Sequence, residues 1–573
     1  MRLLRWLGAA VVLATVLGAV WVARWRPREA SGPSPSDGFT RVAGVVHVHT
    51  TLSDGGGTPA EVAAAARRAG LQFVAITDHN NLDAKPFEGY HDGVLVLVGT
   101  EVSTASSGHV LGLGLREDPT FRFSGDPRDA VDDIRLLGGA AFAAHPSSPR
   151  PDFRWTAWDL PGPWGLELIN GDSQWRAAGA FRLARTAALY ALNPAYALLG
   201  SLTPPDATLA QWDRLLAARD VPGIAGADAH GRLMVSKDRG VPFPSYESVF
   251  GLSVNHVLLE RPLSGRADAD SRAVAFALGR GRSYAALDAL APAGGFFFVA
   301  ESAGRRATMG DTVRAEPAPR LRAGGRLPAR ARLRLLRNGA VLAEGERALE
   351  RVAPGPGVYR VEVRVPGWSV PWVLSNAIYV FPAAEATERA RRAAWPAEPP
   401  APPPAAVIED FEGRSVFEPA SAPASALDRK ILDPHAGVDG RGAARLAFRL
   451  EPPTAAQPNP YCALVDWTQR DLSGRTGLVF QVRGDGVYRI WIQVRDPNPA
   501  SADEGTEWWF ASVRTSTEWR RVAVPFARLR SVNPRTDGRL DLDKVRAIVF
   551  VLDRGAVQPG TQGTIWLDQV GVY

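Results

Sequence analysis

Short apolar runs alternate with helical stretches through the first half of the chain. The apolar runs are typical of buried strands, and Pro59–Ala69 and Ala207–Arg219 are typical of the helices between them. Strands that alternate with helices indicate an α/β domain with parallel strands. The pattern therefore predicts an α/β domain over residues 39–290. Its main apolar runs are Val45–Val48, Phe73–Ile76, Val94–Val98, Ala140–Ala144, Gly165–Ile169 and Gly223–Ala227.

The second half of the chain is dominated by strand patterns. Asn338-Gly339 separates two strand-like runs and is a strong signal for a two-residue hairpin. We expect a small all-β, immunoglobulin-like module over residues 291–382. Residues 383–406 hold a short Arg/Ala-rich helix and a proline run, which predicts an extended linker. Residues 407–573 show period-two alternation, as in Tyr488–Arg495, which predicts a C-terminal β-sandwich.

The N-terminal segment has a different pattern, because Trp6–Ala23 carries no charge. This length reaches the low end of the range for a membrane-spanning helix. Residues 1–26 are therefore predicted to form a single transmembrane signal anchor, followed by a Pro/Ser/Gly-rich linker over residues 27–38. A cleaved signal peptide is the alternative, although Trp21 is large for the position that cleavage requires. The first interpretation gives a membrane-anchored protein with its bulk exported, and the second a secreted one.

Composition and charge narrow the possible classes of protein. The hydrophobic share of 46% and the charged share of 22% exclude wholesale disorder. Cys462 is the single cysteine, which excludes a disulfide scaffold and thiolate zinc fingers. The net charge of +6 is small for 573 residues and comes without a long basic run. We therefore expect no specific nucleic-acid binding.

Histidines and carboxylates gather at the ends of the apolar runs. His47 and His49 end the first run, and side chains two apart on a strand point the same way, so both imidazoles can reach one metal. Taken alone, a strand-end histidine is more often structural, Asp54 suits a turn, and Glu101 suits a loop cap. Together these residues predict a metal site, since sites in α/β barrels gather where strands end. The later members of the set are Asp54, His79, Glu101, His109, His145, Asp228 and His230.

This set resembles the motifs of the PHP (polymerase and histidinol phosphatase) superfamily over about residues 42–288. The resemblance implies a distorted seven-stranded (β/α) barrel. It also implies that two or three divalent ions, commonly zinc, manganese or iron, are bound and that phosphate esters are hydrolysed. The motifs that carry it are His47-Val-His49, Ser53-Asp54-Gly55, Thr77-Asp78-His79, Gly99-Thr-Glu101, His109, Ala144-His145-Pro146 and Asp228-Ala-His230.

The same resemblance implies how the ligands are shared among the ions. The first ion would be held by His47, His49, Glu101 and Asp228. Glu101 would bridge to a second ion completed by His109 and His145. A third ion would be held by Asp54, His79 and His230.

The ligand types suggest the chemistry. Imidazole and carboxylate without thiolate suit Zn²⁺, Mn²⁺ or Fe²⁺. A hydroxide held by two ions would attack phosphorus in line, which makes Glu101 and Asp228 catalytic as well as ligating. Asp78 is expected to orient a ligand, with a helix N-cap as the alternative. Arg150 and Arg232 are expected to hold the phosphate, with surface charge as the alternative. The histidines expected to be structural are His91, His256 and His435.

The C-terminal segment resembles the jelly rolls of family 11 carbohydrate-binding modules and of complex I intermediate-associated proteins. The resemblance rests on Val407–Gly413, Gly477–Val482, Glu518–Phe526 and Ile565–Tyr573. It implies a carbohydrate partner, although tryptophans of a β-sandwich also fill cores. The tryptophans considered for a sugar-stacking face are Trp467, Trp491, Trp508, Trp509 and Trp519.

The leading hypothesis is a membrane-anchored, exported, metal-dependent phosphoesterase. Its substrate would be a phosphorylated small molecule or a nucleotide. A first alternative is a non-catalytic cell-envelope protein that binds metal and carbohydrate. A second is a hydrolase with the same metal site that cleaves a non-phosphate bond.

Overall fold

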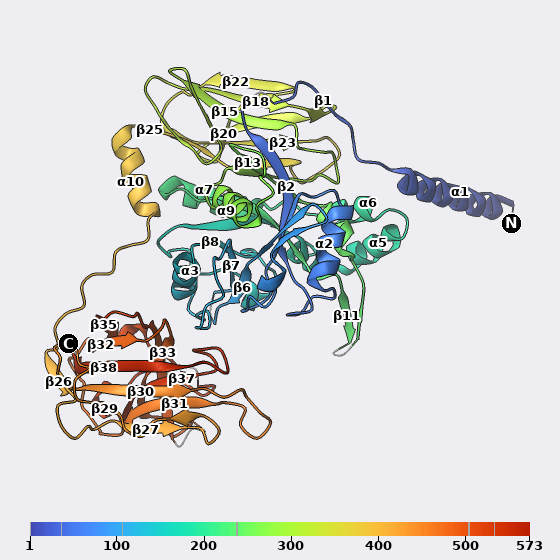
Figure 1. Ribbon diagram of the computed structural model, residues 1–573. Helices are drawn as coiled ribbons and strands as arrows, with labels where there is room; N and C mark the ends of the chain where they lie inside the picture. Colours follow the sequence, from blue (N-terminus) through green and yellow to red (C-terminus); the bar gives the residue numbers. More distant parts are fainter. Residues whose placement is uncertain (1, 36, 106, 237–238, 502–504, 532) are drawn as a thin grey trace. The chain divides into compact units, whose positions relative to one another are not determined.

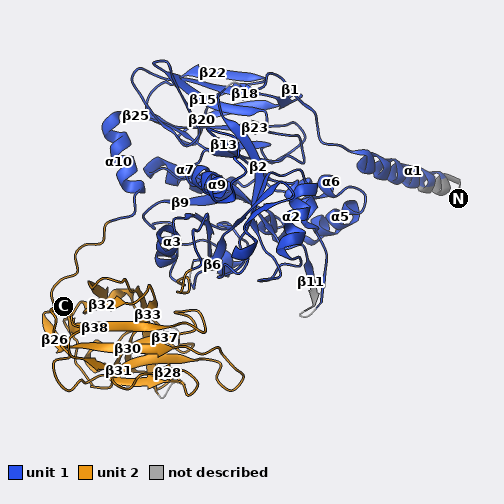
Figure 2. Cartoon of the chain, viewed as in Figure 1, with its two compact units in different colours: residues 1–118, 125–396 blue, residues 119–124, 397–573 orange. Residues whose placement is uncertain are grey.

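In the computed structural model the chain forms two compact units (Figure 2). The first consists of residues 1–118 and 125–396, and the second of residues 119–124 and 397–573. The predicted borders at residues 290 and 382 both fall within the first unit and stay predictions. The structure describes residues 2–35, 37–105, 107–236, 239–501, 505–531 and 533–573.

A closed ring of strands forms the centre of the first unit (Figure 1). The strands pair in parallel except β7, which is antiparallel to both of its neighbours. The last strand, β10, pairs back onto β2 and closes the ring. The predicted barrel is thus present, with β7 as its distortion. In order of pairing the ring contains β2 (Thr40–Val48), β3 (Phe73–Ile76), β5 (Val94–Val98) continued by β6 (Thr100–Ser103), β7 (His109–Leu113), β8 (Ala140–Ala143), β9 (Trp164–Asn170) and β10 (Gly223–Ala229).

Helices connect the ring strands, and local sequence explains where they begin. In α2 (Pro59–Arg68), Thr58 and Glu61 form a capping box and Pro59 occupies the first turn. The predictions of helices at Pro59–Ala69 and Ala207–Arg219 are confirmed by α2 and by α7 (Asp206–Ala218). The other helices around the ring are α3 (Pro127–Leu136), α4 (Gly171–Arg176), α5 (Ala180–Tyr190), α6 (Pro194–Leu199), α8 (Tyr246–Phe250) and α9 (Ala267–Gly279).

The ring strands are buried along their length, as runs of apolar residues in parallel strands require. Every residue of β5 and of β9 is buried. Phe73, Phe142 and Ile224 belong to one continuous apolar core. This packing makes the ring a rigid support for the side chains at its ends.

The ring sheet continues into the predicted small β module. The first half of β2 pairs with β13 (Val254–Leu259), β13 with β14 (Ser283–Ala286), and β14 with β24 (Val373–Ser375). The Asn338-Gly339 hairpin is confirmed between β20 and β21. The module's other main strands are β15 (Phe296–Ser302), β16 (Arg305–Thr308), β17 (Thr312–Arg314), β18 (Arg320–Gly325), β20 (Arg332–Arg337), β21 (Ala340–Gly345), β22 (Ala348–Val352), β23 (Gly357–Arg364) and β25 (Ile378–Phe381).

The predicted linkers are partly held against the first unit. In the first linker, β1 (Ala30–Ser31) pairs with β19 (Leu327–Pro328). In the second, the predicted helix is confirmed as α10 (Ala383–Ala393). Its Arg389 is 4% exposed and donates hydrogen bonds to Asp220 and to two backbone carbonyls of α7. Buried hydrogen bonds of this kind fix the start of the predicted linker.

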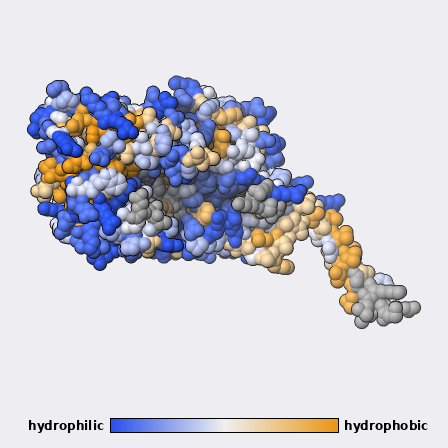
Figure 3. Space-filling model, turned by 90° about the horizontal axis from the view of Figure 1, so that it is seen from below, coloured by the Kyte–Doolittle hydropathy of each residue, from blue (hydrophilic) through white to orange (hydrophobic). Residues whose placement is uncertain are grey.

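The predicted N-terminal helix forms as α1 (Arg2–Arg24). Apolar side chains lie exposed along it (Figure 3), and Trp6 is 75% exposed. The C-terminal end of α1 is held in place because the Asn193 side chain donates hydrogen bonds to the carbonyls of Val22 and Trp25, at 3.2 and 3.0 Å. Within the described residues, no helix combines the length and the apolar character that crossing a membrane needs. The transmembrane role predicted for Trp6–Ala23 is therefore unsupported.

The second unit consists mainly of two antiparallel sheets, which confirms the predicted β-rich C-terminal region. Phe480, Ile492 and Phe550 belong to the core that the sheets enclose. One sheet holds β26 (Ala406–Glu409), β28 (Ala426–Leu427), β29 (Leu432–Asp433), β30 (Ala443–Arg449), β32 (Gly477–Gly484), β35 (Arg520–Pro525) and β38 (Gln562–Val572). The other holds β27 (Glu418–Ser421), β31 (Tyr461–Asp466), β33 (Arg489–Pro497), β34 (Thr506–Arg514), β36 (Arg530–Ser531) and β37 (Ala547–Asp553).

Candidate metal centre

The structure brings all the predicted ligands together at one end of the ring. The parallel strands end there, so the residues that follow them share one face. Because β7 runs the opposite way, it begins at this end, and its first residue, His109, reaches the same cluster. By element, His47, His49 and Asp54 follow from β2, His79 from β3, Glu101 from β6, His109 from β7, His145 from β8, and Asp228 and His230 from β10.

The residues predicted for a first ion converge on a common point. The Nε2 atoms of His47 and His49 each lie 3.2 Å from Glu101 Oε2. The same two nitrogens lie 3.4 and 3.5 Å from Asp228 Oδ1. All four side chains are buried. Two imidazoles and two carboxylates therefore direct donor atoms at one small region.

The residues predicted for a second ion gather on the other oxygen of the same glutamate. Glu101 Oε1 lies 2.8 Å from His109 Nδ1 and 2.8 Å from His145 Nε2. Glu101 thus presents one oxygen to each of two histidine groups. This is the geometry that a bridging carboxylate requires.

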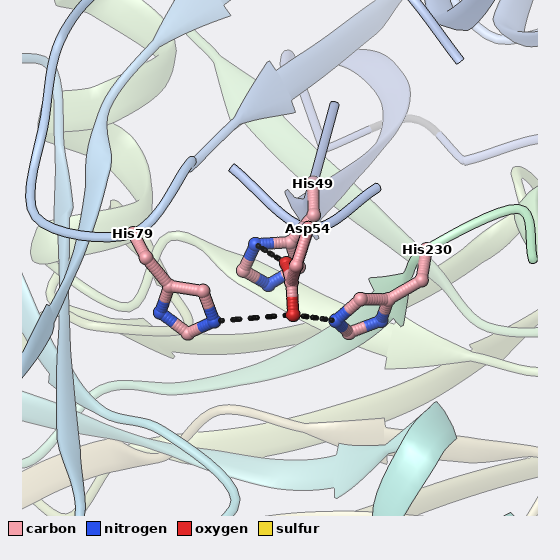
Figure 4. Close-up of side chains that lie close together, drawn as sticks. All are labelled: His49, Asp54, His79 and His230. Atoms are coloured by element: carbon pink, nitrogen blue, oxygen red, sulfur yellow. Dashed lines mark ion pairs between the residues drawn. The ribbon is translucent and has the colours of Figure 1, made fainter. Parts of the chain in front are cut away.

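The third group is centred on Asp54 and is shown in Figure 4. The imidazoles of His79 and His230 lie on opposite sides of its carboxylate, with Nε2 atoms 3.8 and 3.3 Å from Asp54 Oδ2. His49 Nδ1 lies 3.5 Å from the other oxygen. His79 Nδ1 is also 3.3 Å from Glu101 Oε2, so His79 joins this group to the first. Asp54 is 49% exposed, which makes the third group the most open.

Several imidazole nitrogens in the cluster lack hydrogen-bond partners. Among the described residues, His47 Nε2, both ring nitrogens of His49, and His79 Nδ1 are buried without one. Leaving a buried polar atom unsatisfied costs about 1–3 kcal/mol. A divalent ion between these nitrogens and the carboxylates would satisfy both, and this donor set suits zinc, manganese or iron. The residues present therefore fit the metals that the motifs imply.

Electrostatics favour positive charge in the cluster. Burial by itself would lower the pKa of His47, but the carboxylates of Asp228, Glu167 and Glu101 outweigh it and raise that pKa well above its usual value. Burial likewise opposes charge on His145, yet Glu101 raises its pKa to about 9. Burial would raise the pKa of Glu101, but His47 and its other histidine partners hold it well below normal. The buried carboxylates therefore need cations, which protons or divalent ions supply.

Three of the predicted ligands have a strained backbone. His47, His145 and Asp228 have φ angles of 66°, 29° and 48°. Left-handed conformations at residues other than glycine cost about 1–3 kcal/mol and cluster at functional sites. The fold thus maintains an unfavourable backbone in order to place these side chains.

Glu167 on β9 is a site residue that the sequence analysis did not predict. Its Oε1 lies 2.7 Å from His47 Nδ1. Its Oε2 accepts hydrogen bonds from the backbone N–H of His145 at 2.6 Å and from the Asn170 side chain at 2.9 Å. With Nδ1 hydrogen-bonded to Glu167, His47 is left with Nε2 facing the ligands of the first ion. The available signal was a single acidic residue inside the apolar run Gly165–Ile169.

Asp78 contacts the loop before Asp54 instead of a ligand side chain. It accepts hydrogen bonds from the backbone N–H and the hydroxyl of Thr50, both at 2.7 Å, and from the Ser53 hydroxyl. None of the described helices begins at Asp78, so the alternative helix N-cap does not apply. The expected role of orienting a ligand stays a prediction, in which Asp78 would act on Asp54 through the backbone of this loop. Asp78 fixes the turn that carries Asp54.

A polar cavity of about 270 Å³ reaches the cluster. Arg150 lines it and stacks on Phe153, with the guanidinium carbon 3.6 Å from the ring centroid. Arg176, which the sequence analysis did not single out, also lines it and forms an ion pair with Asp172. Arg232 lines a neighbouring cavity. Anionic groups entering either cavity would meet a guanidinium.

The histidines expected to be structural do not join the described metal groups. His91 Nε2 lies 2.9 Å from the carbonyl oxygen of Phe87. His256 Nε2 lies 2.9 Å from Asp288 Oδ1. His435 lies in the second unit.

Comparisons with known proteins agree with the motifs. A family model described as the PHP domain matches residues 46–122. An uncharacterized protein of Methanocaldococcus jannaschii is 34% identical over 119 residues, which cover 18% of this chain and 67% of the relative. The family match spans the motifs from His47 to His109, and the resemblance stated from the sequence is thereby confirmed.

Solved structures are similar to each unit. A two-domain protein from Bacteroides vulgatus, containing a predicted PHP-like metal-dependent phosphoesterase, is 16% identical with a TM-score of 0.29, over 61% of this chain and 99% of that chain. A family 11 carbohydrate-binding module from Clostridium thermocellum, in complex with a β-1,3-1,4-mixed-linked tetrasaccharide, is 19% identical with a TM-score of 0.24. That match covers 29% of this chain and 93% of the module.

Proposed function

The chain belongs to the PHP domain family, and on this basis we propose that it is a metal-dependent hydrolase that cleaves phosphate esters. The observation that supports this most strongly is the position of Glu101. One of its oxygens faces His47 and His49, and the other faces His109 and His145. A single buried carboxylate shared in this way suits a site for two or more ions.

Different residues of the chain would bind the phosphate and hold the metal ligands in place. Divalent ions, when bound, lower the pKa of a coordinated water and neutralise charge on phosphoryl oxygens. Arg150 and Arg176 line the polar cavity and would pair with the remaining phosphate oxygens. Glu167 keeps the His47 ring in place, and Asp78 keeps the turn of Asp54 in place.

The cavity favours hydrolysis of a phosphate ester over the two alternatives. A structural metal site is usually a closed cage of four ligands, whereas here a cavity of about 270 Å³ reaches the ligands. The arginines of that cavity favour an anionic substrate over a neutral ester or amide. A phosphate ester meets both conditions.

The test is a substrate panel with the full-length protein. After chelation and reloading with Mn²⁺, Zn²⁺ or Fe²⁺, the protein is assayed on phosphomonoesters, phosphodiesters, carboxylic esters and amides. We expect release from a phosphate ester that depends on the added metal. Hydrolysis of carboxylic esters or amides alone would support the second alternative. Bound metal without any hydrolysis would support a non-catalytic protein.

A second function is favoured by an aromatic face on the second unit. Arg495 lies 4.1 Å from the Trp508 ring centroid and 5.5 Å from that of Trp467. Trp491 and Arg495 lie on the same face of β33, and Trp508 pairs with Arg495 from β34. Aromatic rings beside a hydrogen-bond donor suit stacking against a sugar ring. A carbohydrate is therefore the proposed partner of this unit.

A further inference from the structure

A second cavity, of about 230 Å³, adjoins the metal centre. Residues that line the polar cavity also line this one, so it opens onto the ligand cluster. The shared residues are Asp54, Asp172, Arg176, Asp228 and His230. A group covalently attached to a phosphate at the metal centre could therefore occupy it.

Apart from the five shared residues, Ser201 and Arg232, the side chains that line this cavity are apolar. Trp175 and Phe243 form one corner, with ring centroids 5.6 Å apart and planes at 66°. Tyr190 packs against Phe243, at 4.7 Å between ring centroids. Four further apolar side chains of the wall are 4–8% exposed: Leu198, Leu202, Val249 and Leu252. Water in such a place finds few partners, which favours an apolar occupant.

Arg232 adds a charged donor to the wall that the apolar side chains form. Arg232 lines the cavity, and its Nε is buried without a hydrogen-bond partner among the described residues. A buried donor without a partner is stabilised when it forms a hydrogen bond with an acceptor. An occupant with an apolar body and an acceptor oxygen would match the walls and Arg232 together.

We propose that this cavity binds an aromatic leaving group, so that the substrates are aryl phosphate monoesters. The inference rests on the proposed function and specifies its substrate class. A cavity of about 150 Å³ is enough to bind benzene, and 230 Å³ admits a larger ring system. Against the apolar walls, only Ser201 and Arg232 offer partners besides the residues shared with the polar cavity. The hydroxyls of a sugar or glycerol phosphate would lose water there for few hydrogen bonds, which disfavours those leaving groups.

The reaction balances as a hydrolysis. The oxygen of a water molecule bonds to phosphorus, and the bond between phosphorus and the aryl oxygen breaks. One proton of that water ends on the aryl oxygen, which leaves as a phenol or naphthol. Inorganic phosphate is the other product.

The test separates binding from turnover. Binding of 1-naphthylmethylphosphonate, which has no hydrolysable ester bond, is compared with that of methylphosphonate by calorimetry on the metal-loaded full chain. We expect the naphthyl compound to bind at least tenfold more tightly. Equal affinities would overturn the inference.

Leu202→Trp fills the cavity, and Val249→Phe does so from another wall. Each should reduce the ratio of the two affinities, and the ratio of kcat/KM for 1-naphthyl phosphate over glycerol 2-phosphate, by tenfold or more. A naphthyl ester has the better leaving group and reacts faster for that reason alone. This intrinsic difference is the same for every variant, so it cancels when the ratio of kcat/KM values is compared between variants. Phe181→Ala is the matched control, because Phe181 is 85% exposed on α5 and does not line the cavity.

The outcomes distinguish the two proposals. If the naphthyl compound binds tightly but no ester is hydrolysed, the proposed function fails and the cavity assignment stands. If glycerol 2-phosphate and 1-naphthyl phosphate are hydrolysed alike, and filling the cavity leaves their ratio unchanged, only the cavity assignment fails. Thermal melts of Leu202→Trp and Val249→Phe show whether each variant is folded, and only a folded variant is used to judge the cavity assignment.

Discussion

The barrel and the C-terminal sandwich present their functional side chains in different ways. In the barrel, histidine side chains from several strands surround one carboxylate. Nitrogens of His47, His49, His79, His109 and His145 lie 2.8–3.3 Å from the Glu101 oxygens. In the sandwich, Trp491 and Trp508 lie on the same face of one sheet with Phe510 between them, and Arg495 lies against Trp508. A converging cluster suits a small ion, which needs several ligands at once. A flat aromatic face suits an extended ligand held by additive contacts. One substitution should therefore abolish the first function and only weaken the second.

The largest effect is expected for Glu101→Gln. The amide cannot serve two ions as a carboxylate does, so activity should fall by about two orders of magnitude or more. Elemental analysis should also show fewer bound ions than the two or three expected for the parent protein. Glu350→Gln, at an exposed carboxylate on β22, is the control. Near-normal turnover and metal content in Glu101→Gln would show that this carboxylate does not bridge.

A smaller loss of metal affinity is expected for residues that do not bind the metals themselves but hold a ligand in place. Glu167→Gln removes the carboxylate that orients His47, and metal affinity should fall by about 10–100-fold. Gly226→Ala should also lower the metal affinity, because a Cβ there would lie 1.7 Å from Glu167 Oε1 and would displace the carboxylate from His47. Competition with a chelator measures both variants. Unchanged affinity in Glu167→Gln would mean that the strained backbone of His47 holds its ring in place without the carboxylate.

The sequence predicted the cluster correctly because strand ends in a closed parallel ring must meet. Asp228 and His47 are far apart in the chain, yet each lies next to the last residue of a ring strand and reaches the same face. Glu167 and Arg176 were missed for different reasons. Glu167 lies inside an apolar strand, where a motif search expects packing, and Arg176 depends on the path of the short helix after β9.

The sequence could not sort the tryptophans of the sandwich. Trp508 and Trp509 are adjacent, so they must point to opposite faces of β34. Trp509 lies in the core and its Nε1 donates to Asp496, whereas Trp519 lies near Arg483 of the other sheet. A shift of register by one residue would exchange the faces, and only long-range strand pairing fixes that register. For the same reason the continuation of the ring through β13, β14 and β24 was not predicted.

The aromatic face gives a graded prediction. Trp508→Ala should weaken binding of the isolated protein to a soluble β-glucan by about tenfold or less, since one aromatic contact adds about 0.5–1.5 kcal/mol beyond its area. Affinity electrophoresis through a glucan-containing gel measures this. Trp519→Ala is the matched control, because Trp519 directly precedes β35 and lies near Arg483 of the other sheet. Equal loss in both variants would place sugar binding elsewhere, and metal content should stay unchanged in either.

The smallest effect is expected in the core of the sandwich, which carries none of the proposed binding residues. Cys462 lies on β31 with no exposed surface, and its burial raises the pKa of the thiol to about 12. A raised pKa keeps the thiol protonated at neutral and mildly alkaline pH, and the thiolate is the reactive form. Alkylation of the native protein at pH 8 should therefore be far slower than after unfolding in guanidinium, as mass spectrometry of the labelled peptide would show. Rapid labelling of the native protein would mean that β31 opens readily. The sandwich would then be a less rigid support for its aromatic face than the barrel is for its ligands.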